Sequence, residues 1–523
     1  MKLFRETIKT GIFLLFIGIV LMTSCKKSVT GDSSAALEII PADATFVVSV
    51  DYENLVKKGQ LDNLDNYAFL QKLQAEIADD MPEGDRELIF NFVKDPSSLG
   101  LNLKTFYLFG LSPETTRNGS LGVFIAFNVA KQSVFEESIK KIFDDENFEI
   151  ENKGAFRKVK GDDAPLMWNE EVAVISSLPF EHSPDDLSFL FEKKSSVKDN
   201  EEFSEFINKQ GDIKAWFKYD NLFKSIAASG LANSDQVPPA IFGKINYLAS
   251  VNFENGEILF DYNAFPKSEV DRLNEKYPVL KKDFNDKLLE DFPEENFLLF
   301  KFAVNIKEYI TLLGDLLQGN NPLEDLKIQN VTNAFAGDFV LNIHGFADGF
   351  IPVPLVGLGF TVTGKQGFED ILSLIPPGYL NKSGDIYIIT LPHLPLVSIF
   401  IAEKDNRVIA SNDRKQIEAF VGKGFDRSLK NSEILTKHKG SINFAYVNLD
   451  LSTYPLSIRG ILNNLGKNSD KLVYILNNLH SVKAWHDDRY VSFCSFKFAD
   501  PSKNSLQTLL EIIDRTSSTG DFE

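Results

Sequence analysis

Landmarks in the chain recur at a nearly constant distance, and this repeat constrains the fold more than any other feature. The matched pairs are Gly110 and Gly345 (235 residues apart), Phe135-Glu136 and Phe368-Glu369 (233), Val174-Ile175 and Val408-Ile409 (234), Leu222 and Leu451 (229), and Phe265 and Phe498 (233). Chance matches would scatter more widely in spacing. We therefore expect an internal duplication, with one half over residues 37–285 and the other over residues 286–523.

One earlier pair departs from this spacing. Val50 and Val304 are 254 residues apart, so about twenty extra residues belong to the first half. The acidic stretch 79–95 falls in that interval, and we interpret it as an insertion. Each half is then near the upper size of one domain and long enough to bury its own core.

The order of strands and helices indicates the fold class. Strands are predicted at 45–50, 105–110, 121–129, 213–219, 297–305, 339–345, 356–363 and 442–447, and hairpins or strand-rich segments at 166–176, 245–265, 397–410 and 485–498. Helices are predicted at 66–78, 132–143 and 505–514. Strands that follow one another across turns, with helices between some of them, are typical of the α+β class. We expect two tandem similar halves, each a mixed, mostly antiparallel sheet with helices packed on one face. Whether the halves share one sheet or form two cores is left open.

The N-terminus has the three parts of a secretory signal. Lys2, Arg5 and Lys9 precede an apolar run over residues 11–22, and Thr23-Ser24-Cys25 closes it. A run of twelve residues is too short to span a bilayer, which takes about 20. Residues 21–25, Leu-Met-Thr-Ser-Cys, resemble a bacterial lipobox. The resemblance implies a signal peptide over residues 1–24, a lipid on Cys25 and a flexible tether over residues 25–36. The alternative is an ordinary signal peptide with a chance cysteine.

The charge of the chain excludes several kinds of partner. A net charge of −19 repels nucleic acid phosphates and anionic headgroups, so we expect no nucleic acid partner and no electrostatic membrane binding. Contact with the membrane is expected through the N-terminal lipid alone. The remaining partner is an unknown envelope protein or a small ligand. Cys494 is the other of two cysteines, and we expect it to be a small core residue.

A family resemblance rests on the start of the expected folded part. Residues 40–58 read IPADATFVVSVDYENLVKK: a turn, an apolar strand, an aspartate and a helix. After a lipobox and a short tether, this segment resembles the Bacteroidota lipoproteins grouped as domain of unknown function 4836. The resemblance implies a cell-envelope location and carries over no functional residue. In surface-exposed lipoproteins of that phylum an acidic run often follows the lipidated cysteine. Here Lys26-Lys27-Ser28 follows it instead, which favours the periplasmic face of the outer membrane over the cell surface.

Residues that could carry chemistry do not form a recognised motif. No two of the six histidines lie within five residues of each other, and neither a Gly-x-Ser-x-Gly elbow nor a phosphate-binding loop occurs. Asp51, Asp220 and Asn305 stand at strand ends before helices. Carboxylate catalysis is one interpretation, and helix capping is the simpler one. We therefore assign no catalytic residue, no metal ligand and no cofactor.

One connection is unusually apolar. Residues 346–355 read FADGFIPVPL, whereas the matching place in the first half, residues 111–120, reads LSPETTRNGS. The apolar copy either covers a core or is exposed to a partner. On the second interpretation Phe350, Ile351 and Val353 form a contact patch.

These observations favour a cell-envelope lipoprotein that binds or scaffolds something and catalyses nothing. One alternative is a periplasmic hydrolase whose site is assembled only in three dimensions. The other is a lipid- or peptide-binding carrier.

Overall fold

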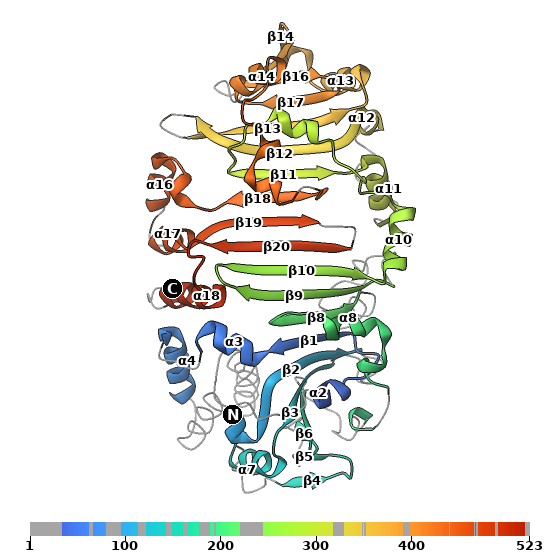
Figure 1. The fold of residues 1–523 in the computed structure, drawn as a ribbon, viewed down its shortest axis with the longest axis vertical. Helices are drawn as coiled ribbons and strands as arrows, with labels where there is room; N and C mark the ends of the chain where they lie inside the picture. Colours follow the sequence, from blue (N-terminus) through green and yellow to red (C-terminus); the bar gives the residue numbers. More distant parts are fainter. Residues whose placement is uncertain are drawn as a thin grey trace. The chain divides into compact units, whose positions relative to one another are not determined.

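The computed structural model divides into two compact units, which we describe separately (Figure 1). Unit 1 comprises residues up to Pro266 together with those from Pro501 onward, and unit 2 comprises Lys267–Asp500. The structure describes residues 34–61, 66–79, 96–112, 122–142, 149–159, 166–176, 189–192, 195–219, 244–316, 329–347, 349, 352–390, 398–438, 440–464, 466, 469–486 and 490–517.

Unit 1 is built on an antiparallel sheet. Its strands are β1 (Phe46–Asp51), β2 (Leu101–Leu111), β3 (Gly122–Val129), β4 (Ile150–Asn152), β5 (Arg157–Val159), β6 (Leu166–Trp168), β7 (Val172–Ser176), β8 (Ile213–Lys218), β9 (Asn246–Glu254) and β10 (Glu257–Phe265). They pair in the order β10-β9-β8-β1-β2-β3-β7-β6-β5-β4, and each of these pairs is antiparallel.

Unit 2 is also built on antiparallel strands. Its strands are β11 (Leu298–Ala303), β12 (Phe335–Ala347), β13 (Val353–Val362), β14 (Leu380–Ser383), β15 (Ile386–Thr390), β16 (Ser398–Lys404), β17 (Arg407–Ser411), β18 (Phe444–Asn448), β19 (Leu479–His486) and β20 (Val491–Phe498). They pair in the order β20-β19-β18-β11-β12-β13-β17-β16-β15-β14. Each strand of unit 2 thus stands in the same place as the strand ten numbers earlier in unit 1.

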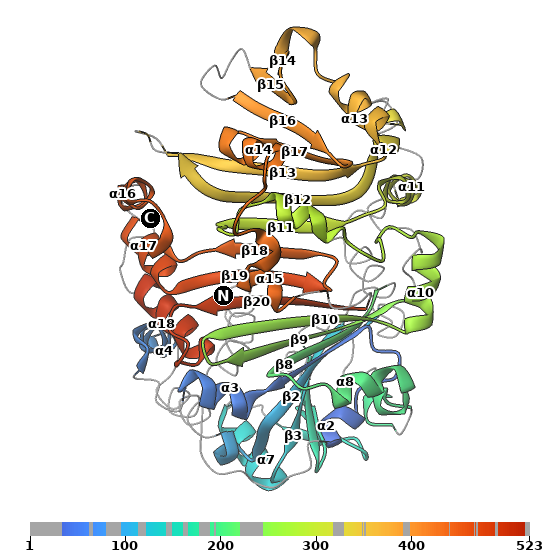
Figure 2. The ribbon, with the colours of Figure 1, turned by 45° about the horizontal axis from the view of Figure 1, so that its top comes forward.

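Helices connect and cover these strands (Figures 1 and 2). Unit 1 contains α2 (Ser34–Glu38), α3 (Tyr52–Gly59), α4 (Ala68–Asp79), α7 (Gln132–Ile142), α8 (Ser204–Asn208) and α18 (Ser505–Ser517). Unit 2 contains α10 (Lys267–Lys276), α11 (Ile306–Leu316), α12 (Gln329–Ala334), α13 (Lys365–Leu372), α14 (Arg414–Val421), α15 (Glu433–Thr436), α16 (Leu456–Asn463) and α17 (Ser469–Asn477). The α+β class expected from the sequence is therefore confirmed.

Each unit buries apolar cores of its own. In unit 1, one buried apolar cluster contains Phe109 of β2, Phe124 of β3 and Trp216 of β8. Trp216 is fully buried, while the other residues of β8 are half-buried. In the described part of unit 2, one cluster contains Phe292 and Phe420 and another lies around α13 and β13.

Turn chemistry places the predicted hairpins correctly. β9 and β10 flank Asn255-Gly256, where the glycine has a φ of 67°. β16 and β17 flank Asp405 and Asn406, whose φ angles of 54° and 62° suit the left-handed turn that these residue types tolerate. The hairpin over 166–176 is also present as β6 and β7.

The helix that follows the last strand belongs to the other unit's core. α18 packs against α3, α4 and β9 of unit 1, where Leu510 and Ile512 are buried. The backbone N–H of Phe69 donates to Asp514 Oδ1 at 2.8 Å. The first stretch of unit 1 ends at Pro266, and unit 2 ends at Asp500. The boundary between the duplicated halves, expected between residues 285 and 286, stays a prediction. The expected insertion over residues 79–95 lies almost wholly outside the described residues.

Candidate functional site

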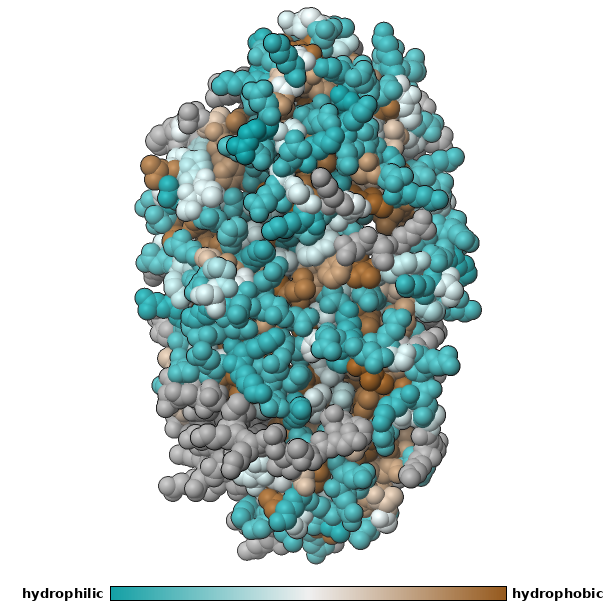
Figure 3. All heavy atoms as spheres, in the orientation of Figure 1, coloured by the Kyte–Doolittle hydropathy of each residue, from teal (hydrophilic) through white to brown (hydrophobic). Residues whose placement is uncertain are grey.

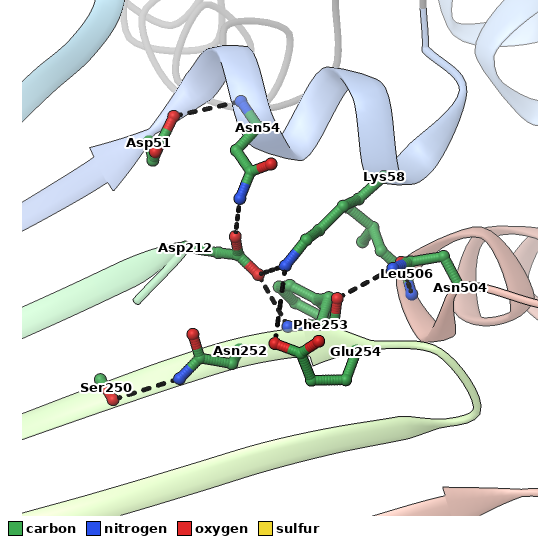
Figure 4. Close-up of polar contacts among 10 residues, drawn as sticks. All are labelled: Asp51, Asn54, Lys58, Asp212, Ser250, Asn252, Phe253, Glu254, Asn504 and Leu506. Carbon is green, nitrogen blue, oxygen red and sulfur yellow. Dashed lines mark hydrogen bonds and ion pairs between the residues drawn. The ribbon is translucent and has the colours of Figure 1, made fainter. Parts of the chain in front are cut away.

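A buried aspartate organises a polar cluster of unit 1 (Figure 4). Asp212 precedes β8, and its side chain is 2% exposed. Its carboxylate accepts hydrogen bonds from Lys58 Nζ and from the backbone N–H of Phe253, both at 2.7 Å, and from Asn54 Nδ2. All of its partners are donors supplied by α3 and β9.

The helix beside Asp212 is capped as the sequence predicts. Asp51 is the N-cap of α3 and accepts from the backbone N–H of Asn54 at 3.1 Å. Burial raises the pKa of Asp51, the Asn54 N–H opposes this, and the nearby carboxylate of Asp212 adds to the increase. Asp51 is thus committed to the helix end, and the capping interpretation holds for it. Asn305 lies directly before α11, and Asp220 is outside the described residues.

This cluster is also tied to the chain's last helix. Asn504 Nδ2 donates to the carbonyl of Phe253 at 2.8 Å, and Asn504 Oδ1 accepts from the backbone N–H of Leu506 at 3.0 Å (Figure 4). Lys58 also faces Glu254 at 4.0 Å. Asp212 and Asn504 therefore join elements of the fold, as a structural tie requires.

Unit 2 contains two buried aspartates with similar commitments. Asp338 accepts from Lys281 Nζ at 2.8 Å and from Thr361 Oγ1 at 2.9 Å. Asp291 accepts from Arg407 Nε at 2.7 Å. Burial raises the pKa of Asp291 to about 6, and the Arg407 guanidinium only partly offsets that effect.

Two histidines of unit 2 have partners that recur in catalytic sites. His344 Nε2 lies 3.1 Å from Asp413 Oδ2, while its Nδ1 is buried without a hydrogen-bond partner among the residues that the structure describes. His486 Nε2 lies 3.1 Å from Ser492 Oγ, and these two residues face each other across β19 and β20. A serine bonded to a histidine is the start of a nucleophile-and-base arrangement. Among the described residues no group of three His, Cys, Asp or Glu side chains could hold a metal ion.

Cys494 differs from its expected state. It is half-buried on β20 rather than fully enclosed, and burial raises the pKa of its thiol. A raised pKa lowers the thiolate fraction at neutral pH, so the residue is a poor nucleophile.

An exposed apolar surface of unit 2 is the strongest candidate for an interaction site. We call it the apolar edge, and it consists of Phe346, Val353, Tyr454, Leu456, Ile461 and Leu472. The tip of β12 and β13 lies beside α16 in both ribbon views (Figures 1 and 2). Brown, hydrophobic atoms reach the surface over α16 at the left edge of Figure 3.

Aromatic contacts join the two parts of the apolar edge. The ring centroid of Phe297 lies 5.0 Å from that of Phe346 and 4.8 Å from that of Tyr454. Tyr454 leads into α16 through Pro455, and its hydroxyl donates to the carbonyl of Asn448 at 2.5 Å. The strand tip and the helix therefore share one aromatic base.

α16 and α17 carry the most exposed part of the apolar edge. Leu456 is 77% exposed and Ile461 is 47% exposed, and α16 contains no buried residue. Leu472 of α17 is 37% exposed. A helix at the surface of a folded protein normally buries its apolar stripe against the core. An apolar stripe that stays exposed therefore marks a surface that can contact another molecule.

Of the site residues predicted from the sequence, the structure describes only some. Val353 opens β13 opposite Ala347 and is 39% exposed, while Phe350 and Ile351 lie outside the described residues. The patch therefore stays a prediction, and Cys25 also lies outside the described part of the chain. Neither α16 nor α17 was expected from the sequence. The apolar residues within 456–462 and 472–476 are the signal that could have indicated these helices. Among the described helices none is long and apolar enough to cross a membrane.

Comparisons with known proteins give a family and little more. The family model described as Domain of unknown function (DUF4836) matches residues 37–506. Two solved structures are similar, both of TP0453. Crystal form III is 11% identical with a TM-score of 0.25 and covers 48% of this chain and 89% of that one. Crystal form I is 9% identical with a TM-score of 0.24 and covers 47% and 87%. Likeness at this level carries no argument about fold or function. No curated protein matches the chain.

Proposed function

The chain belongs to the family Domain of unknown function (DUF4836), and from that premise we propose that it is a lipid-anchored cell-envelope protein that binds and does not catalyse. The proposal includes the Bacteroidota lipoprotein affiliation, a lipid on Cys25 and the periplasmic face of the outer membrane. It also includes descent of the two halves from one duplicated unit, which the shared strand order supports.

The observation that carries the binding role is the apolar edge. Four of its six side chains are exposed, whereas the buried acids Asp212, Asp338 and Asp291 are each matched to a cation or a backbone donor inside the fold. A protein whose buried acids are paired inside the fold and which presents apolar groups at its surface is suited to contact another molecule.

The anchor is tested by metabolic labelling with a radioactive fatty acid. We expect the intact chain to incorporate label and to remain with the membrane fraction. Cys25→Ala should abolish both, because the sulfur that accepts the lipid is gone. Cys494→Ala is the matched control, since it removes the other cysteine and leaves the acceptor in place. Label in the Cys25→Ala chain, or none in the intact chain, would contradict the anchor.

The pair formed by Ser492 and His486 favours a second candidate, an envelope hydrolase. Its two atoms are within hydrogen-bond reach, as a nucleophile and base require. The simpler account is a cross-strand polar pair, because the two residues are direct partners in the sheet.

A fluorophosphonate probe distinguishes the two accounts, because it labels only an activated serine. We expect no labelling of the intact chain. The measurement is mass spectrometry of the peptide that contains residue 492, with Ser495→Ala as the control for a neighbouring strand serine. Labelling that Ser492→Ala abolishes would replace the binding proposal with the hydrolase.

A further inference from the structure

One face of α16 is open and carries no charge. Leu456 and Gly460 are four residues apart, as are Ser457 and Ile461, so the four side chains share one side of the helix. A Cβ built on Gly460 would meet no atom within 4 Å. The half-buried Ile458 and Leu462 lie on the other side of the helix, and α16 packs against α17. The open face is therefore a strip of two large apolar groups separated by two small residues.

The charges near this face differ from those of the whole chain. Residues 455–478 contain Arg459, Lys467 and Lys471 against one acid, Asp470, in a protein with a net charge of −19. Arg459 adjoins the open face, and its Nε is buried without a hydrogen-bond partner among the described residues. A cation beside an uncharged apolar strip is the pattern of a helix that lies in a bilayer interface, with the cation at the phosphate level.

We propose that α16 rests in the headgroup region of a phospholipid bilayer, with Leu456 and Ile461 among the acyl chains and Arg459 at a lipid phosphate. The contact rests on the proposed envelope location, because only there does the folded chain meet a bilayer. Residues 26–33 separate Cys25 from α2. Nine residue steps reach at most about 30 Å, so an acylated chain holds α2 within about that distance of the membrane.

A bilayer fits this face better than a charged protein partner does. The face offers two apolar side chains and no acidic one. It therefore discriminates little between partners and tolerates variation in the molecule that it contacts. The overall negative charge of the protein opposes anionic lipid, which predicts a preference for zwitterionic headgroups. Apolar insertion then provides the attraction, and the single arginine provides orientation.

The test is flotation of the chain from Lys26 onward with zwitterionic phosphatidylcholine vesicles. This chain keeps every described residue and lacks the acylation site, so its binding is separate from the anchor. We expect a measurable bound fraction that falls about tenfold in the double variant Leu456→Asp, Ile461→Asp, because both inserting groups become charged. Asn463→Asp is the matched control, since it adds a charge to the same helix and removes no apolar group.

A second variant protects the test against misfolding. Gly460→Leu fills open space on the same face and should raise the bound fraction several-fold. Circular dichroism confirms that each variant keeps the wild-type fold. Three outcomes would overturn the inference: absence of flotation, flotation that the double variant leaves unchanged, or concentration-dependent self-association in light scattering that the double variant abolishes while vesicles do not bind. None of them affects the fatty acid labelling of Cys25, so failure here and failure of the proposed anchor are distinguishable.

Discussion

Asp212 shows how far a single buried side chain can organise its surroundings. Its carboxylate joins α3 to β9 through Lys58, Asn54 and the Phe253 backbone, and its own backbone bonds to Asp51 at 2.8 Å and to Val251 at 3.0 Å. Lys58 and Asp212 are 154 residues apart in sequence. No local pattern could have predicted this pair, because the two residues are distant in sequence and only the folded chain brings them together.

The first prediction concerns removal of that carboxylate. Asp212→Ala leaves the amine of Lys58 and a buried backbone N–H without their acceptor, so we expect a loss of about 3 kcal/mol in the free energy of unfolding. Urea denaturation measures it. Glu254→Ala is the control, because Glu254 faces the same lysine at 4.0 Å but is 59% exposed, and it should cost under about 0.5 kcal/mol. Equal effects of the two variants would contradict the structural role of Asp212.

The second prediction concerns Asp291, whose pKa burial raises to about 6. The folded state then binds a proton more tightly than the unfolded state, in which the pKa is near 3.8. The contribution of this group to stability is therefore present at low pH and is lost as the pH rises from about 4 to about 6.

The measurement is urea unfolding of the intact chain and of Asp291→Asn at a series of pH values. The stability of the intact chain relative to the variant should fall by up to about 3 kcal/mol between pH 4 and pH 7. Asp405→Asn is the control, because Asp405 faces the same arginine from an exposed turn. A relative stability that stays flat or rises with pH would show that the arginine outweighs burial.

At the scale of elements, prediction succeeded where the chemistry is local. The hairpin turns at Asn255-Gly256 and Asp405-Asn406 were predictable because few residues adopt a left-handed backbone. The cap at Asp51 was predictable for the same kind of reason. α16 and α17 were missed because Gly460, Asn463 and Asn464 interrupt their apolar pattern, so no long helical period stands out. β12 was expected to begin at residue 339, but it begins at 335 with an irregular register that a simple alternation does not reveal.

The third prediction concerns α18. Deleting residues 501–523 removes Leu510, Ile512 and the acceptor of the Phe69 N–H from unit 1. We expect hydrogen exchange to accelerate in α3, α4 and β9, because their apolar cover is lost. β11, β12 and β13 of unit 2 serve as the internal control and should stay protected. Faster exchange in β11 to β13 alone would contradict the assignment of α18 to unit 1.

At the scale of the whole molecule, the repeated spacing anticipated a repeated strand order. The landmarks Gly110 and Gly345 lie on the equivalent strands β2 and β12, and Phe265 and Phe498 end the equivalent strands β10 and β20. The candidate site was only partly foreseeable. Residues 346–355 pointed to the tip of β12 and β13, but α16 joins that tip through Phe297 and Tyr454, a contact that only the folded chain creates.

The position of α18 has a consequence for the order of events during synthesis. The ribosome completes the residues that contact Phe69 only 445 positions after Phe69 itself. The segment around Phe69 therefore lacks one of its packing partners until residue 514 has been made. In the exported chain that we propose, such a delay would leave this region without that partner while it is moved out of the cytoplasm.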